Sequence, residues 1–204
     1  MKLDPFYLIV DSADWIERLV PLGVKLVQLR MKSTDEQALR AHIRRAQAVC
    51  RDHGCQLIIN DHWRLAIEET CDFIHLGQED LAEADLKAIR AAGLKLGLST
   101  HDEAELMTAL DAKPDYIALG PVWPTILKQM KWGPQGVEKL RDWKARIAPL
   151  PLVAIGGVTA ERAPHVLQAG ANTAAVVTDI TRNPDPEARV RQWIEVTAPW
   201  REAG

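Results

Sequence analysis

The sequence predicts a single (β/α)₈ (TIM) barrel domain over residues 1–204. Three observations predict it: eight short apolar runs recur along the chain, most lack the alternation of a half-exposed strand, and helix signals lie between them. Continuous apolar runs suit parallel strands covered on both faces, and repeated strand–helix alternation is typical of this barrel. The runs are Phe6–Val10, Lys25–Leu29, Gln56–Asn60, Asp72–Leu76, Leu94–Ser99, Asp115–Gly120, Leu152–Gly156 and Thr173–Val177.

Two capping-box patterns predict where helices begin between these strands. They are Ser33-x-x-Glu36 and Thr100-x-x-Glu103. The first precedes a predicted helix that ends at Gly54. Its apolar residues recur at helical spacing: Leu39, Ile43, Ala46 and Cys50.

Two further helices are predicted over residues 80–93 and 159–170, each ending at a glycine. Pro164 is tolerated because it lies near the first turn of the second helix. A doubly wound open sheet is the competing architecture. The sequence lacks the glycine fingerprint of a dinucleotide-binding sheet, which favours the barrel.

The composition, 47% hydrophobic and 26% charged residues, indicates a soluble globular protein. A net charge of −3 argues against nucleic acid as the main partner, and no apolar run approaches the roughly 20 residues of a membrane helix. The first residues do not resemble a signal peptide. Cys50, Cys55 and Cys71 form no C-x-x-C pair, so we expect reduced thiols and a cytoplasmic location. The oligomeric state stays open, a homodimer being one alternative.

The segment Leu57–Asp61, LIIND, indicates where a functional site lies. An apolar strand stops there on an amide and a carboxylate, neither of which suits a core. Ligands of this barrel bind at the carboxyl ends of strands and in the loops that follow. Residues that could form a site follow the strands throughout: Gln28, Arg30, Lys32, Asn60, Asp61, His75, Gln78, Glu79, Asp80, Ser99, Thr100, His101, Thr125, Lys128, Gly156, Gly157, Thr178 and Asp179.

The charges at these strand ends suit a diphosphate that is bound together with a divalent cation. Arg30, Lys32 and Lys128 are cations suited to phosphate oxygens. Asp61 and Asp80 would repel a phosphate unless a cation lay between them. Because Mg²⁺ is commonly held by one or two carboxylates and phosphate oxygens, we expect Mg²⁺ here.

A second phosphate site is expected after strands seven and eight, at Gly156, Gly157 and Thr178, where barrels of this class often bind a monophosphate. Structural interpretations stand beside the functional ones. The glycine pair could supply only a tight turn, and the basic residues could be solvated loop charges. An aspartate after a strand is often a helix N-cap, and Asp80 could cap the helix that contains Leu86 and Ile89.

Seven motifs cover nearly the whole chain in this order: VQLRMK, IINDHWRLAI, FIHLGQEDL, LGLSTH, ALGPVWPTILK, VAIGGVT and AAVVTDI. In sequence and order they resemble the thiamine phosphate synthase family. That family consists of Mg²⁺-dependent (β/α)₈ barrels that condense 4-amino-2-methyl-5-(diphosphooxymethyl)pyrimidine with 4-methyl-5-(2-phosphooxyethyl)thiazole, giving thiamine phosphate and pyrophosphate. The resemblance implies a transferase of thiamine biosynthesis that binds two phosphorylated substrates.

The resemblance also implies a role for each matching residue. The pyrimidine diphosphate would be bound by Gln28, Arg30, Lys32, Asn60, Ser99 and Lys128, and the thiazole phosphate by Thr125, Leu127, Gly157, Val177 and Thr178. Asp61 and Asp80 would bind Mg²⁺. Catalysis would rest on Arg30, Ser99 and Lys128. Pyrophosphate would leave first, and the thiazole nitrogen would attack the resulting pyrimidinylmethyl cation, so the protein would mainly neutralise charge and align the reactants.

Some positions depart from the usual family pattern. Met31 stands where glutamate is usual, and His62 where arginine is usual. Leu127 replaces the second threonine of the turn after strand six, and it cannot donate a hydroxyl hydrogen bond to a thiazole substrate. Thr178 replaces a serine and keeps its hydroxyl group.

The sequence leaves three other functions open. A thiazole tautomerase relative would need no diphosphate site, and the retained diphosphate residues argue against it. A metal-dependent hydrolase could use His62, His75 and His101 with Asp61, although the sequence lacks H-x-H and H-E-x-x-H spacings. On an apolar strand, His75 is more often a packed and hydrogen-bonded residue. A barrel that senses a phosphorylated ligand without catalysis is the third.

Overall fold

The computed structural model describes residues 2–125 and 132–202. In this part of the chain, eight parallel strands pair in sequence order and β8 returns to β1, which closes the barrel. The predicted fold class is therefore confirmed. The strands are β1 (Phe6–Val10), β2 (Leu26–Leu29), β3 (Gln56–Asn60), β4 (Phe73–Leu76), β5 (Lys95–Thr100), β6 (Tyr116–Leu119), β7 (Leu152–Ala154) and β8 (Thr173–Val176).

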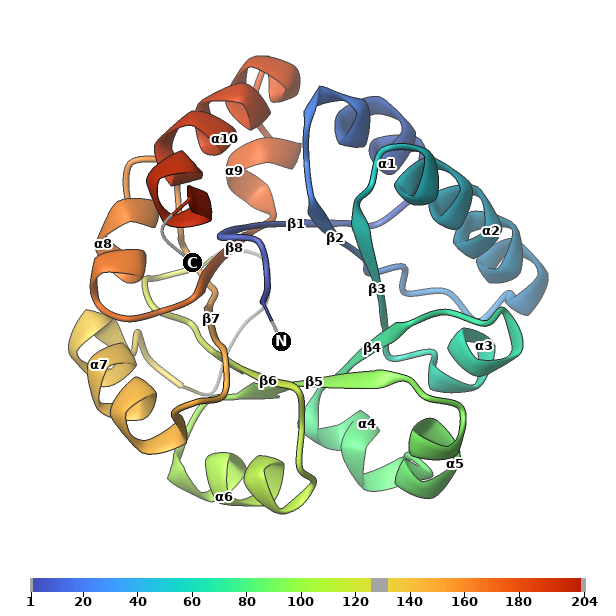
Figure 1. The fold of residues 1–204 in the computed structure, drawn as a ribbon, viewed down its shortest axis with the longest axis horizontal. Coiled ribbons are helices and arrows are strands. Elements are labelled where there is room, and N and C mark those ends of the chain that lie inside the picture. The colour runs from blue at the N-terminus through green and yellow to red at the C-terminus, as the bar shows by residue number, and fades with distance from the viewer. Residues whose placement is uncertain (1, 126–131, 203–204) are drawn as a thin grey trace.

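Helices surround the barrel, and Figure 1 shows them as a ring outside the strands. They are α1 (Ala13–Leu19), α2 (Glu36–Asp52), α3 (Trp63–Glu68), α4 (Gln78–Glu83), α5 (Leu86–Ala91), α6 (Glu103–Asp111), α7 (Gly136–Ile147), α8 (Ala163–Gln168), α9 (Thr178–Thr181) and α10 (Pro186–Glu202), with the 3₁₀ turn η1 (Val20–Leu22) after α1. In the described part of the chain, no helix combines the length and the apolar character needed to cross a membrane.

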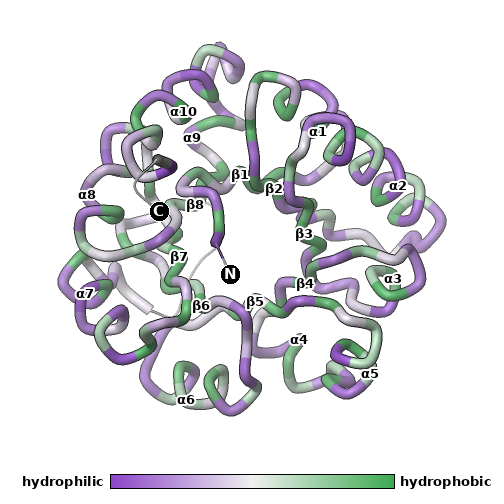
Figure 2. Tube along the Cα trace, viewed as in Figure 1, coloured by the Kyte–Doolittle hydropathy of each residue, from purple (hydrophilic) through white to green (hydrophobic). Residues whose placement is uncertain are grey.

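The strands are apolar because they are covered on both faces. One set of side chains packs outward against the helices. In Figure 2, much of the tube along the strands is coloured green, for hydrophobic residues. The other set fills the barrel interior and includes Tyr7, Ile58, Phe73, Tyr116 and Val153. The interior is thus a packed core rather than a pore, and a ligand can enter only at an end.

The two predicted helix N-caps were each wrong by two residues. The Asp35 carboxylate accepts a hydrogen bond from Ala38 N and caps α2, whereas Ser33 Oγ accepts one from Asp35 N within the preceding turn. Asp102 caps α6 in the same way. Thr100 instead ends β5, and its hydroxyl donates to Ala118 O on β6. In both places an aspartate nearer to the helix satisfies the free N–H groups.

The two glycine-terminated helices are shorter than predicted. The segment over residues 80–93 divides into α4 and α5, because the chain is extended at Ala84 and Asp85 then caps α5. In the segment over residues 159–170, turns precede α8, which begins only at Ala163 with Pro164 in its first turn. Several strand runs are also trimmed by one or two residues, whereas β1 and β3 have the predicted bounds.

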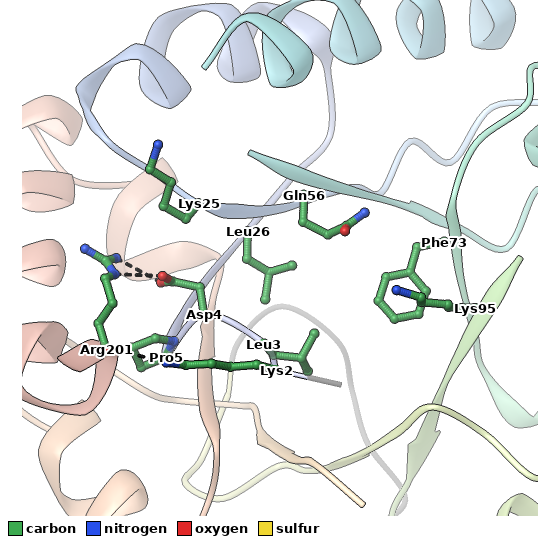
Figure 3. Close-up of a pocket in the computed structure, with 10 residues that line it drawn as sticks. All are labelled: Lys2, Leu3, Asp4, Pro5, Lys25, Leu26, Gln56, Phe73, Lys95 and Arg201. Atoms are coloured by element: carbon green, nitrogen blue, oxygen red, sulfur yellow. Dashed lines mark hydrogen bonds and ion pairs between the residues drawn. The ribbon is translucent and has the colours of Figure 1, made fainter. Parts of the chain in front are cut away.

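The amino ends of the strands form the closed end of the barrel. The N-terminal segment crosses this end, and Arg201 of α10 donates to both oxygens of Asp4, at 2.7 and 2.9 Å. Figure 3 shows this ion pair beside a cavity of about 290 Å³. Lys25 also lines it, but its ammonium group donates to His53 O at 2.8 Å. The charged groups of Arg201, Asp4 and Lys25 are therefore engaged in contacts that hold the chain in place at this end.

Candidate functional site

The carboxyl ends of the strands surround a cavity of about 350 Å³, a size suited to a small ligand. Every strand contributes at least one residue to its lining. All residues to which the family resemblance assigned a role, and that lie in the described part of the chain, line it: Gln28, Arg30, Lys32, Asn60, Asp61, Asp80, Ser99, Thr125, Gly157, Val177 and Thr178. Thr100 and Asp179, also candidates from their positions after strands, do not. Leu127 and Lys128 lie outside the described residues, and their contacts stay predictions.

The LIIND segment ends at this cavity through an unusual backbone turn. Asn60 is buried at the last position of β3, and Asp61 follows with φ of 63°, a left-handed conformation that is uncommon outside glycine. Asp61 N donates to His75 O on β4 at 2.9 Å, which fixes the turn. His62, not Asp61, is the N-cap of α3. The turn brings Asp61 to the cavity, and the interpretation of Asp61 as a helix cap is wrong.

Asp80 reaches the same cavity from the next unit of the barrel. It lies in the first turn of α4, whose N-cap is Gly77, while Asp85 caps α5. The proposed capping role of Asp80 is therefore wrong as well. A side chain at Gly77 would place its Cβ 3.1 Å from the Asp80 carboxylate, so glycine leaves room for this residue.

The two carboxylates influence each other. Burial raises the pKa of the Asp61 carboxyl above its usual range, and the neighbouring Asp80 carboxylate adds to this rise, whereas Lys32 and Arg30 oppose it. No group of three or more His, Cys, Asp or Glu side chains within residues 2–125 and 132–202 is arranged to hold a metal ion. Asp61 and Asp80 are thus two neighbouring carboxylates at the cavity, and their predicted binding of Mg²⁺ stays a prediction.

Arg30 and Lys32 follow β2 on a loop that is held at its backbone. Arg30 N donates to Val10 O at 2.7 Å, which continues the pairing with β1. Between the two cations, Met31 O accepts a hydrogen bond from His62 Nε2 at 2.9 Å. The two residues that depart from the family pattern on this side thus contact each other, which residue-by-residue reading of the sequence missed.

The glycine pair after β7 lies against the loop that follows β6. Both glycines have positive φ, 95° at Gly156 and 64° at Gly157. A Cβ at Gly157 would lie 2.5 Å from Pro124 O, and one at Gly156 would lie 2.6 Å from Pro121 Cα. Glycine is therefore required for the close approach of the two loops.

Val177 and Thr178 begin the short helix α9 on the adjacent side of the cavity. Asp179 fastens this helix: its carboxylate accepts from Arg189 at 2.7 Å through both oxygens and from Trp193 Nε1 at 2.8 Å. It also accepts from Ala160 N, in the loop after β7, at 3.2 Å. Asp179 thus joins the two loops that were predicted to hold a phosphate and does not line the cavity itself.

His75 has the packed, hydrogen-bonded position that the structural interpretation predicted. It is 7% exposed, and its ring nitrogens lie 2.7 Å from the Tyr116 hydroxyl and 2.8 Å from Ser99 Oγ. Burial lowers the pKa of His75 to about 4, so the ring is neutral. Tyr7 lies 3.2 Å from the Tyr116 hydroxyl and accepts from Gln28. Sequence reasoning missed both tyrosines, whose only signal was a hydroxyl group inside an apolar strand.

A further wall of the cavity combines His101, a predicted candidate, with Trp132 and Glu105, which sequence reasoning missed. Trp132 stacks on His101 with ring centroids 4.3 Å apart, and its indole N–H lies 3.0 Å from Asp102. His101 Nδ1 lies 2.7 Å from Glu105. The rings of His62, His75 and His101 thus contact three different sets of partners, so a shared histidine metal site of the hydrolase type is wrong.

Comparisons with known proteins agree with this arrangement. The model of a family described as thiamine monophosphate synthase matches residues 6–180. The thiamine-phosphate synthase of Rhizobium etli is 76% identical over 204 residues, covering 100% of both chains. That of Salmonella typhimurium is 50% identical over 192 residues, 94% of this chain and 88% of the relative. The solved thiamine phosphate pyrophosphorylase of Pyrococcus furiosus has a TM-score of 0.85 over 97% of this chain and 96% of that chain. At 22% identity it shows the fold alone.

Proposed function

The chain belongs to the thiamine monophosphate synthase family, and we propose from this membership that its cavity carries out the synthase reaction. The protein is a transferase that joins 4-amino-2-methyl-5-(diphosphooxymethyl)pyrimidine to 4-methyl-5-(2-phosphooxyethyl)thiazole and releases pyrophosphate. The observation that carries the proposal is the meeting of Arg30, Lys32, Asp61 and Asp80 at one end of the barrel. Two cations and two carboxylates around one cavity suit a diphosphate bound with a divalent cation.

Asp61 and Asp80 are the residues that would hold Mg²⁺. Their donor set fits this ion: both are carboxylates, burial and then the neighbouring Asp80 raise the pKa of Asp61, and a cation between them would offset their repulsion. When bound, Mg²⁺ would supply positive charge to the departing diphosphate. Arg30 and Lys32, on the loop after β2, would supply further positive charge to the diphosphate, and Lys128 is proposed to join them. Neutralising the leaving group in this way favours cleavage of the carbon–oxygen bond.

Gln28, Asn60 and Ser99 would bind the pyrimidine side of the substrate. Gln28 and Asn60 are 2% and 5% exposed, so their amides are fixed by the surrounding core. Ser99 is held twice: its hydroxyl contacts His75, and its backbone carbonyl accepts from Gln78 at 2.7 Å. Rigid polar groups of this kind orient a ligand at little entropic cost.

The thiazole phosphate would lie against Gly157, Val177 and Thr178, with Thr125 on the loop after β6 and Leu127 proposed beside it. Backbone N–H groups and the Thr178 hydroxyl are donors suited to a monophosphate. The thiazole would then lie beside the pyrimidine in one cavity, as attack of its nitrogen on the pyrimidinylmethyl carbon requires. A cytoplasmic location fits the three cysteines, each of which is a free, buried thiol.

The test is incubation of the purified protein with both phosphorylated substrates and Mg²⁺, followed by assays for thiamine phosphate and pyrophosphate. We expect equal amounts of both products, and no product when Mg²⁺ is removed with a chelator. Isomerisation of a thiazole phosphate without pyrophosphate release would support the tautomerase alternative. Binding of both ligands without turnover would support a sensor.

A further inference from the structure

A chain of hydrogen bonds crosses the barrel interior beneath the cavity, from Gln28 on β2 to Ser99 on β5. Gln28 Nε2 donates to the Tyr7 hydroxyl at 2.7 Å, and the Tyr7 and Tyr116 hydroxyls are 3.2 Å apart. The Tyr116 hydroxyl lies 2.7 Å from His75 Nδ1, and His75 Nε2 lies 2.8 Å from Ser99 Oγ. Gln28 and Ser99, the two ends of this series of hydrogen bonds, line the cavity, as do Tyr7 and His75, whereas Tyr116 lies beneath it.

The middle of the chain is closed to solvent. Tyr7 and Tyr116 are 1% and 0% exposed, within a cluster of apolar side chains. A buried polar group without a partner is costly, so each proton here must be donated within the chain. His75 is buried, and both of its ring nitrogens face hydroxyl oxygens rather than a carboxylate that could balance a charge, so the ring carries one proton. Each hydroxyl also carries one proton, which leaves only two consistent arrangements.

In the first arrangement all donors point from Gln28 toward Ser99. Gln28 gives its N–H₂ group to Tyr7, Tyr7 donates to Tyr116, and Tyr116 donates to His75 Nδ1. His75 then carries its proton on Nε2 and donates it to Ser99 Oγ. The groups left for a ligand are the carbonyl oxygen of Gln28, an acceptor, and the hydroxyl proton of Ser99, a donor.

In the second arrangement every bond is reversed. Ser99 donates to His75 Nε2, and the proton of His75 is on Nδ1. The Gln28 amide must also turn over, since the Tyr7 proton now needs the amide oxygen as its acceptor. Gln28 would then offer its N–H₂ group to a ligand, and Ser99 would offer a lone pair. The donor and acceptor roles of Gln28 and Ser99 can therefore change only together.

We infer that Tyr7, Tyr116 and His75 form a relay that holds Gln28 as an acceptor and Ser99 as a donor, and that the relay thereby selects an aminopyrimidine over its oxo analogue. This inference rests on the proposed function of the same cavity. An exocyclic amino group donates to the Gln28 carbonyl oxygen, and a ring nitrogen or diphosphate oxygen accepts from Ser99. An oxo group in place of the amino group would face the Gln28 oxygen and find no donor there. The three relay residues are positioning residues, since they act through Gln28 and Ser99.

The first test measures kcat/KM for the 4-amino pyrimidine diphosphate and for its 4-oxo analogue. We expect the wild-type protein to prefer the amino compound by about 100-fold or more. Tyr116→Phe removes one hydroxyl from the middle of the relay and keeps the ring, so the preference should fall at least about tenfold while KM for the thiazole phosphate is unchanged. Phe73→Leu is the matched control, because Phe73 contacts Tyr116 edge-on in the same core but has no polar atom. It should retain the preference.

The second test reads the relay directly. Nitrogen-15 NMR of the imidazole should find the His75 proton on Nε2 in the ligand-free protein, and binding of the aminopyrimidine diphosphate should leave it there. A proton on Nδ1 would overturn the inference. So would a folded Tyr116→Phe protein that turns over both compounds with the wild-type preference. If Tyr116→Phe does not fold, Tyr7→Phe breaks the next bond of the relay and should lower the preference in the same way.

Failure of the proposed function would give a different result. The wild-type protein would then form no thiamine phosphate, and equilibrium binding of the amino and oxo compounds would replace kcat/KM as the measure of preference. A preference that Tyr116→Phe abolishes, together with the Nε2 proton, would support the relay alone. Equal binding of the two compounds by the wild-type protein would overturn it.

Discussion

Both ends of the barrel carry basic and acidic side chains, but their charged groups have different partners. At the closed end, Arg201 binds both oxygens of Asp4, and the Lys25 ammonium group donates to a backbone carbonyl. At the open end, no carboxylate of the described residues lies within 4.0 Å of the charged groups of Arg30 or Lys32, although Asp61 and Asp80 line the same cavity. The charges at the closed end are therefore engaged in contacts within the fold, whereas Arg30 and Lys32 have no carboxylate partner of this kind among the described residues, as expected if they bind a ligand.

The strongest test of this comparison removes one open-end carboxylate at a time. Asp61→Asn and Asp80→Asn should each lower kcat about 100- to 1000-fold, the usual effect of losing one group that stabilises developing charge. Asparagine also tolerates the left-handed backbone at position 61. The melting temperature should not fall in either variant. Activity at the wild-type level in both would remove the carboxylates from the reaction.

The closed end should respond in the opposite way. Arg201→Gln removes the guanidinium that pairs with Asp4, a carboxylate only 9% exposed, and should cost about 1.5–3 kcal/mol of unfolding free energy. Steady-state kinetics at 25 °C should stay at wild-type values. Arg141→Gln breaks an exposed pair with Glu138 and serves as the control, with little expected change in stability. A loss of activity in folded Arg201→Gln protein would show that the ends are coupled.

The strands and the location of the cavity could be predicted from the sequence, but the helix starts could not. The strands were predicted because burial on both faces leaves continuous apolar runs, and their carboxyl ends then placed Asn60, Asp61, Asp80 and Ser99 at one cavity. Family resemblance extended this to the function. Helix starts were misplaced because a sequence pattern cannot decide between neighbouring caps, and Asp35 and Asp102 lie nearer to the helices than Ser33 and Thr100 do.

Other features depend on contacts between distant residues. The left-handed turn at Asp61 follows from its hydrogen bond to His75 O, and the His62–Met31 contact joins different loops. The relay hydroxyls belong to Tyr7 and Tyr116, which are 109 positions apart. A tyrosine in an apolar strand is read as a core residue unless its partner is known, so these features could not be found from local pattern alone.

A smaller effect is expected at Leu127, where the sequence departs from the family at the open end. Leu127→Thr restores a hydroxyl that could bind the thiazole substrate. One hydrogen bond to a charged group is worth roughly 1.5–3 kcal/mol, but Thr125, Gly157 and Thr178 already offer donors, so we expect KM for the thiazole phosphate to fall only a few-fold. KM for the pyrimidine diphosphate and the melting temperature should stay unchanged. Equal changes in both KM values would place Leu127 outside the thiazole site.

The smallest expected effect is on the pH dependence of stability, and it should have opposite signs for two carboxylates. Burial and Asp80 raise the pKa of Asp61, so the fold favours its protonated form, and its ionisation destabilises the fold as pH rises from about 3.9. In magnesium-free buffer, Asp61→Asn should therefore be more stable than wild type at pH 7. Glu161, on the outer side of the loop after β7, behaves oppositely, because Arg189 lowers its pKa to about 2.

Glu161 thus stabilises the fold at neutral pH, and this contribution is lost as pH falls from about 4.5 toward 2, so Glu161→Gln should be less stable than wild type at pH 7. Urea unfolding of the three proteins between pH 8 and pH 3 is the measurement. As pH falls, the unfolding free energy of Asp61→Asn should approach that of wild type from higher values. That of Glu161→Gln should approach it from lower values. Mg²⁺ with pyrophosphate should then stabilise wild type more than Asp61→Asn, because binding to the native state adds stability only where the carboxylate is present. If Asp61→Asn were less stable than wild type at pH 7 without Mg²⁺, the Asp61 charge would belong with those that stabilise the fold.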